Sequence, residues 1–284
     1  GVTFANRIAV SPMSQYRAER GEVNDWHLVH LGRFALGRAG LVFTEATAVT
    51  EAGRRTHGDL GLWNDEQVDG LARVLAFIER EGSVPGVQLG YADGWPTPVD
   101  MTDDHIAETI EAFGLAARRA RDAGAKIIEV YAAHGFLIHQ FLSPIANHRG
   151  DRWGGSAANR NRFAVEVAHS IRAHWPEDLP LSFRLSATDW VDGGIEVSDS
   201  VETARELKAA GVDMIDCSTG GIGGRERPVR MNIEEGFQVP FARRIRADAD
   251  IATTAVGFLW DPQYCDSVIS DGSADMVALA REIL

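Results

Sequence analysis

The sequence is poor in cysteine and in basic residues, and it lacks long apolar runs. Cys217 and Cys265 are its only two cysteines, which form neither a disulfide framework nor a C-x-x-C metal motif. No stretch approaches the roughly 18 consecutive apolar residues of a membrane span. With 28 basic and 41 acidic residues the net charge is −13, which disfavours nucleic acid and anionic membranes as partners.

The start of the chain, GVTFANRIAV, lacks the charged head and apolar run of an export signal. The composition, 45% apolar and 24% charged over 284 residues, is that of an ordinary globular protein with a large core. We therefore expect a cytoplasmic protein with no metal site, no nucleic-acid partner and no membrane partner.

What the sequence does contain is a regular alternation of short β-rich runs and helical segments. Glycines such as Gly124 and Gly211 follow two of the helical segments, where a left-handed C-cap is expected. Eight alternations without a G-x-G-x-x-G after the first strand predict a single-domain (β/α)8 TIM barrel over residues 1–284. The predicted strands are 8–12, 41–49, 84–89, 126–133, 181–187, 214–219, 251–257 and 276–281, and the predicted helices are 65–81, 102–123, 159–175, 198–210 and 240–247.

In such a barrel, chemistry takes place where the strands end and their following loops begin. Polar groups in this region need hydrogen-bond partners, so a ring of them implies either mutual pairing or a bound polar ligand. Taken alone, Gln88 and Arg184 are also compatible with a buried structural pair, and Gly257 with an ordinary turn. The polar and glycine positions at predicted strand ends are Ser11, Ser14, Glu45, Gln88, Tyr131, His134, Arg184, Ser218, Gly220, Gly221, Gly257 and Arg281.

Several motifs are specific enough to indicate a protein family, among them NRIAVSPM, GLVFTEATAV and AAHGFLIHQFLSP. Together they resemble the FMN-dependent old yellow enzyme family, and in particular its bacterial xenobiotic-reductase branch. The resemblance extends in family order over nearly the whole chain. Its segments are 6–13, 25–27, 39–49, 88–90, 132–144, 147–149, 154–156, 159–160, 184–187, 216–218, 255–257 and 280–282.

The resemblance implies a bound FMN and assigns expected contacts to it. The backbone from Ser11 to Ser14 is expected along the flavin, Ala46 close to the ring, and Gln88 at its pyrimidine edge. Arg184 is expected near N1 and O2, where a fixed positive charge stabilises the reduced flavin.

The resemblance also implies a phosphate grip made by the backbone around Gly257 and the guanidinium of Arg281, after the seventh and eighth strands. The segment from Asn147 to Arg160 is expected to tie a long loop together rather than to act in catalysis. The full set of expected cofactor contacts is Ser11, Pro12, Met13, Ser14, Ala46, Gln88, Arg184, Gly257 and Arg281.

On the substrate side the chain departs from the family pattern. Family members place His and His, or His and Asn, where this chain has Tyr131 and His134. Phe136 replaces the tyrosine that protonates the substrate carbon, so either Tyr16, Tyr131 or water donates instead, or alkene reduction is not the native reaction. Ser14 replaces a cysteine that modulates the flavin. The expected catalytic residues are therefore His134, Tyr131 and Tyr16.

The chain also departs from the family in length. The family continues after its third strand with a His-Ala-Gly-Arg segment and a long loop, whereas this chain has the shorter segment 91–100. Either access to the substrate is reorganised, or loop residues are missing from the sequence given. The chain stops at Leu284, before the final helix of the family, so we expect missing C-terminal residues and an uncovered apolar face.

The expected function is that of an FMN-dependent oxidoreductase acting on a small-molecule substrate. NAD(P)H would reduce the flavin at N5, and the hydride would pass to an enone or to a cyclic or aromatic carbonyl compound oriented by His134 and Tyr131. The alternatives are a flavin-dependent dehydrogenase or oxidase, which needs a base, and a non-catalytic flavin-binding domain of a larger redox protein. A Schiff-base aldolase is disfavoured because Lys126 begins its strand. The resemblance implies a homo-oligomer.

Overall fold

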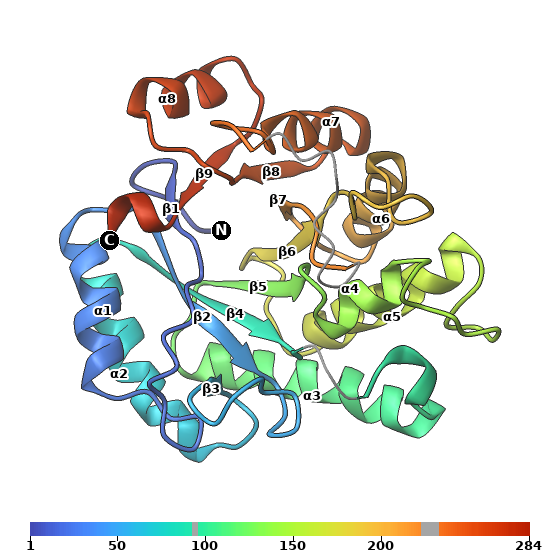
Figure 1. The fold of residues 1–284 in the computed structure, drawn as a ribbon. Coiled ribbons are helices and arrows are strands. Elements are labelled where there is room, and N and C mark those ends of the chain that lie inside the picture. Colours follow the sequence, from blue (N-terminus) through green and yellow to red (C-terminus); the bar gives the residue numbers. More distant parts are fainter. Residues whose placement is uncertain (93–95, 223–232) are drawn as a thin grey trace.

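The computed structural model describes residues 1–92, 96–222 and 233–284, and within these ranges eight parallel strands close into a barrel (Figure 1). Closure follows from β1, which pairs with β2 on one side and with β9 on the other. A short β3, Leu60–Gly61, adds to the edge of β2. The barrel strands are β1 Ile8–Val10, β2 Leu41–Ala48, β4 Val84–Gly90, β5 Ile127–Ala132, β6 Leu181–Ser186, β7 Met214–Ser218, β8 Ala252–Ala255 and β9 Met276–Leu279.

Helices surround the barrel on its outer face (Figure 1). The predicted (β/α)8 fold is confirmed, and each predicted strand overlaps an observed one. The five predicted helices correspond to α2, α3, α5, α6 and α7. The helical elements are α1 Asp25–Leu36, α2 Glu66–Arg80, α3 Asp103–Asp122, α4 Leu137–Leu142, α5 Ala157–Arg172, α6 Val197–Ala209, α7 Val239–Ala249 and α8 Pro262–Ser270, with 3-10 turns η1 Pro98–Asp100 and η2 Arg281–Ile283.

Helices α1, α4 and α8 were not predicted from the sequence. Helix α4 has only 6 residues, too few for a helical period to be recognised. Helix α1 buries His27 and His30 on the face that touches the barrel, and α8 buries only Val268. Helix ends follow the expected chemistry more closely. Gly124 and Gly211 adopt φ values of +91° and +92°, which confirms the left-handed ends predicted for two helices.

The core has two apolar parts, and their positions determine how far along the barrel axis the polar residues of the site begin. A large apolar cluster fills the space between strands and helices. A smaller cluster, which includes Leu41, Phe43 and Ile127 from the first halves of their strands, fills the lower barrel. Polar side chains follow further along the strands, at Gln88, Glu129, Arg184 and Asp216. The apolar layer therefore closes the barrel below and leaves the polar layer facing the end where the strands finish.

The long loop between α4 and α5 is tied down as predicted. The Asn147 amide donates to the carbonyls of Phe141 and Trp153, both at 2.8 Å. The Arg149 guanidinium donates to the carbonyls of Pro98 and Met101 at 2.5 and 2.6 Å. These contacts confirm a structural role for this segment.

An apolar groove of about 570 Å³ lies between β9, α8 and the residues before β1. Ile8, Ile269 and Leu279 contribute to its lining. Among the described residues, no helix is long and apolar enough to cross a membrane.

Candidate active site

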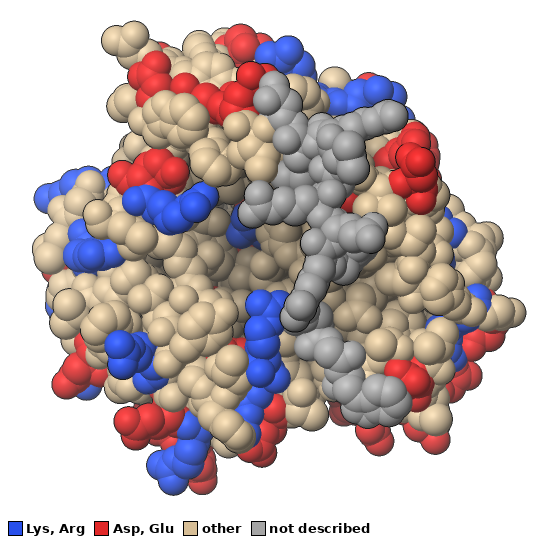
Figure 2. Space-filling view, in the orientation of Figure 1, with Lys and Arg blue, Asp and Glu red and all other residues tan. Residues whose placement is uncertain are grey.

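The polar side chains of the strands converge at one end of the barrel, and this face is hollowed at its centre (Figure 2). Five buried residues on the strands and on the loop after β1 form what we call the floor of the site: Ser11, Gln88, Glu129, Arg184 and Asp216. Residues beyond or at the strand ends form what we call the rim: Tyr16, Tyr131, His134, Phe136 and Ser218.

Arg184 is the centre of the floor. Its Nη1 donates to the Ser11 hydroxyl at 3.1 Å, and its Nε lies 3.7 Å from an Asp216 carboxylate oxygen. Gln88 donates through Nε2 to Glu129 at 2.7 Å. Gln88 and Arg184 thus each bond another residue, whereas the sequence alone also allowed a direct pair between them. Among the described residues, Arg184 Nε has no hydrogen-bond partner although it is buried.

Burial dominates the electrostatics of the floor. It raises the pKa of Glu129 to about 8, with a further contribution from the Asp216 carboxylate and an opposing one from Arg184. Burial also raises the pKa of Asp216, against the effect of Arg184. Glu129 is therefore mainly protonated at pH 7, and Asp216 is the carboxyl group closest to the Arg184 charge.

The segment after β1 is held by a side chain from β2. The backbone N–H of Gln15 donates to Glu45 at 2.7 Å, and the other Glu45 oxygen lies 3.3 Å from His27 Nε2 of helix α1. These contacts fix the course of residues 11–16, where the sequence places four of the expected flavin contacts. Sequence reasoning did not predict the role of His27, whose only signal was its place in a family motif.

The two residues of the predicted phosphate grip lie together. Gly257 and Arg281 line one cavity after β8 and β9, and the Arg281 guanidinium stands 5.3 Å from the centre of the Phe258 ring. Gly257 has a φ of +111°, and a Cβ there would lie 2.3 Å from Gln238 Nε2. A glycine is required at this turn for its conformation and for its space, so it is more than an ordinary turn glycine.

The rim contains a chain of hydrogen bonds that the sequence did not predict. The Tyr131 hydroxyl lies 2.8 Å from His134 Nδ1, and His134 Nε2 lies 2.6 Å from the Ser218 hydroxyl. Burial lowers the pKa of His134 well below 6.5, and the Arg184 charge adds to the effect. Burial raises the pKa of Tyr131. Both groups are therefore neutral near pH 7.

Close backbone packing positions His134. Its φ is +55°, an unusual value for a residue with a side chain. A Cβ on Gly221 would lie 2.1 Å from the His134 Cα, so the loops after β5 and β7 approach each other without room for a side chain. The backbone N–H of Gly135 donates to His139 Nδ1 at 2.9 Å, and His139 Nε2 is 2.8 Å from Asp189. Since Nδ1 accepts, the His139 proton sits on Nε2 and is donated to Asp189.

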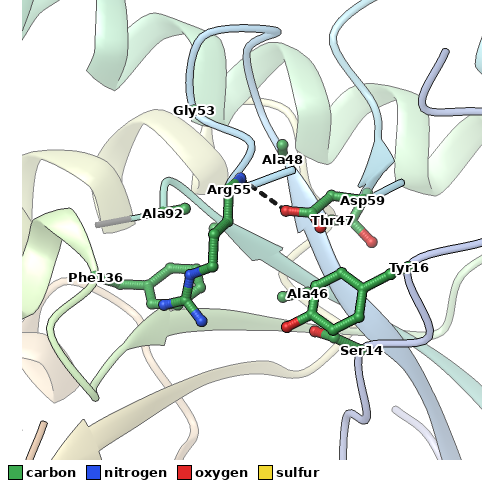
Figure 3. A pocket seen from close by; sticks show the side chains of 11 residues that line it. Ser14, Tyr16, Ala46, Thr47, Ala48, Gly53, Arg55, Asp59, Ala92 and Phe136 are labelled. Carbon is green, nitrogen blue, oxygen red and sulfur yellow. Dashed lines mark hydrogen bonds between the residues drawn. The ribbon is translucent and has the colours of Figure 1, made fainter. Parts of the chain in front are cut away.

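Phe136 occupies the position where the family pattern has a tyrosine. Its ring packs on the Tyr131 ring, with the two centroids 3.9 Å apart. The Arg55 guanidinium lies over the Phe136 ring, 5.3 Å from its centre. Phe136, Tyr16 and Arg55 line one pocket, with Ala46 between them (Figure 3). Arg55 was not among the predicted site residues, because no sequence pattern links it to this pocket.

Tyr16 and Ser14 meet the same pocket from the segment after β1 (Figure 3). Tyr16 is 49% exposed and has a φ of +55°. The structure thus brings the three expected catalytic residues to one end of the barrel. The shortened segment after β4 includes Asp93, Gly94 and Trp95, which lie outside the described residues.

The residues present fit FMN. The buried Arg184 Nε–H has no hydrogen-bond partner among the residues that the structure describes and could donate to a flavin ring, and Gly257 with Arg281 offers a close backbone approach and a cation to the phosphate. Both features lie at the strand ends where barrels bind such ligands. Positive charge at these two points complements the anionic ends of a reduced flavin mononucleotide.

Comparison with known proteins agrees with this arrangement. The sequence profile of the NADH:flavin oxidoreductase / NADH oxidase family matches residues 1–97 and 93–284. An NADPH dehydrogenase from Geobacillus sp. (strain WCH70) is 43% identical over 305 aligned positions, covering 100% of this chain and 88% of that protein. An NADPH dehydrogenase from Bacillus subtilis (strain 168) is 38% identical over 304 positions with the same coverage.

The solved structure of morphinone reductase has the same fold, with a TM-score of 0.84 at 22% identity over 99% of this chain and 83% of that one. The profile match divides at residues 93–97, where the sequence predicts a shortened loop. The motifs, the barrel and these matches agree, and the chain belongs to the NADH:flavin oxidoreductase / NADH oxidase family, the old yellow enzyme family, as an FMN-dependent NAD(P)H oxidoreductase.

Proposed function

We propose that this oxidoreductase uses NADPH to reduce an enone or a cyclic or aromatic carbonyl compound whose oxygen is oriented by Tyr131 and His134. The observation that carries the proposal is the hydrogen-bonded pair of these residues, 2.8 Å apart, at the strand ends above Arg184. The relatives called NADPH dehydrogenase support the choice of reductant. When bound, FMN supplies the redox centre that accepts hydride from the nucleotide and returns it to the substrate.

The chain's own residues perform three tasks in this reaction. Arg184 holds a positive charge beside the flavin site, which favours the reduced, anionic cofactor. Gly257 and Arg281 hold the phosphate. Tyr131, oriented by its hydrogen bond with His134, provides a hydrogen bond for an oxygen that gains negative charge as the substrate is reduced.

The residue at 136 limits where a proton is delivered. Phe136 has no exchangeable proton, and its ring packs between Tyr131 and Arg55. We propose that Tyr16, which lines the pocket with Phe136, or water protonates the substrate carbon.

The homo-oligomer implied by the family resemblance remains a prediction, which sedimentation of the purified protein tests.

A second candidate function uses the floor in the same way but reverses the direction of proton transfer at the rim. In a dehydrogenase or oxidase, Tyr131 would accept a proton from an alcohol or amine rather than donate a hydrogen bond to a carbonyl. The specific observation in its favour is the loss of a proton donor at Phe136. A passive flavin-binding domain would have the floor without any catalytic use of the rim.

Reoxidation of the reduced protein separates these functions. The FMN-loaded protein is reduced under anaerobic conditions with one equivalent of NADPH and then mixed with 2-cyclohexenone or with oxygen. We expect reoxidation by the enone, and slower reoxidation in Tyr131→Phe with an increased KM for the enone. Reoxidation by oxygen alone would overturn the proposal in favour of an oxidase or dehydrogenase, and failure of NADPH to reduce the flavin would favour a passive domain.

A further inference from the structure

His134 is engaged at both nitrogens of its ring. Nδ1 lies 2.8 Å from the Tyr131 hydroxyl oxygen, and Nε2 lies 2.6 Å from the Ser218 hydroxyl oxygen. The three side chains come from β5, from the loop after it and from the end of β7. The ring therefore cannot bond a ligand directly unless one of these two hydrogen bonds breaks. Within the described ranges the Tyr131 hydroxyl has no hydrogen bond other than the one to His134, and Tyr131 is partly exposed, so a second position on this hydroxyl is open to water or a ligand.

The direction of this chain depends on one proton. Burial keeps the pKa of His134 well below 6.5, so the ring is neutral at pH 7 and carries a proton on only one nitrogen. A proton on Nδ1 is donated to the Tyr131 oxygen and leaves the Tyr131 O–H available to a ligand. A proton on Nε2 is donated to Ser218, and the Tyr131 O–H is then used on Nδ1.

Ser218 decides between the two states. Its side chain is 3% exposed, and the described residues provide His134 Nε2 as the only side-chain partner of its hydroxyl. If Ser218 accepted from Nε2, its own hydroxyl proton would be buried without an acceptor. An unsatisfied buried donor is rarer and more costly than an acceptor with a free lone pair. Ser218 therefore donates to Nε2, and the ring proton lies on Nδ1.

We propose that Ser218 is a positioning residue that fixes the Nδ1–H form of His134 and thereby makes Tyr131 the single hydrogen-bond donor to the substrate oxygen. The donors act in series: Ser218 donates to His134, His134 donates to Tyr131, and Tyr131 donates to the substrate. The inference rests on the proposed function for the identity of that substrate, a compound with a carbonyl or phenolate oxygen. An alcohol or an amine would instead require an acceptor at Tyr131.

The neighbouring Ser186 is a matched control. Its hydroxyl accepts from the His134 backbone N–H at 3.1 Å and donates to the Gly220 carbonyl at 2.6 Å, whereas the two ring nitrogens bond Tyr131 and Ser218. Removal of either hydroxyl disturbs the same loop. Only removal of the Ser218 hydroxyl changes the partner of Nε2.

The test is the ¹⁵N NMR spectrum of the histidine rings in the oxidised, FMN-loaded protein without reductant or substrate, with His134→Gln used for assignment. We expect a protonated Nδ1 and an unprotonated Nε2 in the wild type, and a change in the Nε2 resonance in Ser218→Ala but not in Ser186→Ala, because only Ser218→Ala removes the hydrogen-bond donor to that nitrogen. We also expect Ser218→Ala to raise the KM for 2-cyclohexenone roughly two- to tenfold, the effect of one hydrogen bond.

A protonated Nε2 in the wild type would overturn the proposal, as would an unchanged ring in Ser218→Ala. This result is independent of the proposed function, because the spectrum is recorded before any reaction. If the ring has the expected form but the reduced protein is not reoxidised by enones, the proposed substrate class is wrong while the assignment of Ser218 stands.

Discussion

The floor and the rim of the site differ in how they are built. The floor residues Gln88, Glu129, Arg184 and Asp216 lie on strands that pair in register around the barrel. The rim depends on loops, and His134 takes a left-handed conformation to reach its position. The strands fix the floor by backbone pairing, whereas the rim depends on a few close contacts and hydrogen bonds. Strand pairing alone is therefore sufficient to position these floor residues, whereas the rim also requires close contacts between loops.

Removal of the central cation of the floor has the largest expected effect. Arg184→Ala leaves Asp216 without its counter-ion and the flavin site without its positive charge. We expect roughly a 100-fold fall in the rate of flavin reduction by NADPH, together with weaker FMN binding measured by fluorescence quenching. Arg184→Lys retains a charge without the forked geometry of the guanidinium. Its rate of flavin reduction is expected to lie between those of the wild type and Arg184→Ala. Reduction of Arg184→Ala at the wild-type rate would show that the floor does not act on the flavin.

The next prediction concerns a substitution that disturbs the rim and leaves the floor residues unchanged. In Gly221→Ala the new Cβ would lie 2.1 Å from the His134 Cα, at a φ of +107°. We expect a loss of about 2 kcal/mol of stability and a large increase in the KM for 2-cyclohexenone, with FMN affinity retained. Gly124→Ala is a useful control, because it has a similar φ of +91° but open space around it. A parallel loss of FMN in Gly221→Ala would contradict the separation of floor and rim.

Phe136→Tyr sharpens the comparison by restoring a proton donor to the rim. We expect at least about a tenfold faster reoxidation of the reduced protein by 2-cyclohexenone, as is typical of an added general acid. Phe136→Leu removes the ring without adding a hydroxyl and serves as the control. Equal enone turnover in wild type and Phe136→Tyr would mean that protonation at this carbon does not limit the reaction.

The smallest expected effect concerns the pH dependence of stability that originates in the floor. The pKa of Glu129 rises from 4.5 to about 8 in the folded protein. The folded state therefore holds a proton that the unfolded state has lost, and this contribution to stability, complete below pH 4.5, disappears as the pH rises through 8. Glu129→Gln cannot lose that proton.

We expect the melting temperature of the wild type to fall by a few degrees relative to Glu129→Gln between pH 5 and pH 9. Glu177→Gln, at an exposed position, serves as the control and should follow the wild type. Parallel curves for wild type and Glu129→Gln would show that Glu129 is not protonated in the folded state.

The sequence placed part of the floor for a physical reason. Alternating strands and helices determine the barrel, and the barrel determines which residues reach its upper end. Gln88 and Arg184 could thus be placed from their strands. Glu129 and Asp216 were not nominated, because buried acidic residues in strands carry no pattern that separates them from other strand positions.

The sequence identified the residues of the rim but did not predict the contacts between them. Tyr131 and His134 were identified from the family motif, but their bond to each other and to Ser218 depends on how two loops meet across the barrel. Arg55 lies far from the motif in sequence and reaches Phe136 only through the fold. Contacts of this kind require coordinates, since neither periodicity nor composition encodes them.

The most direct test of the account is the visible spectrum of the purified, FMN-loaded protein on anaerobic addition of NADPH. We expect a yellow protein whose flavin absorbance is bleached by one equivalent of NADPH. A protein that does not retain FMN, or a bound flavin that keeps its colour in the presence of both NADPH and NADH, would contradict it.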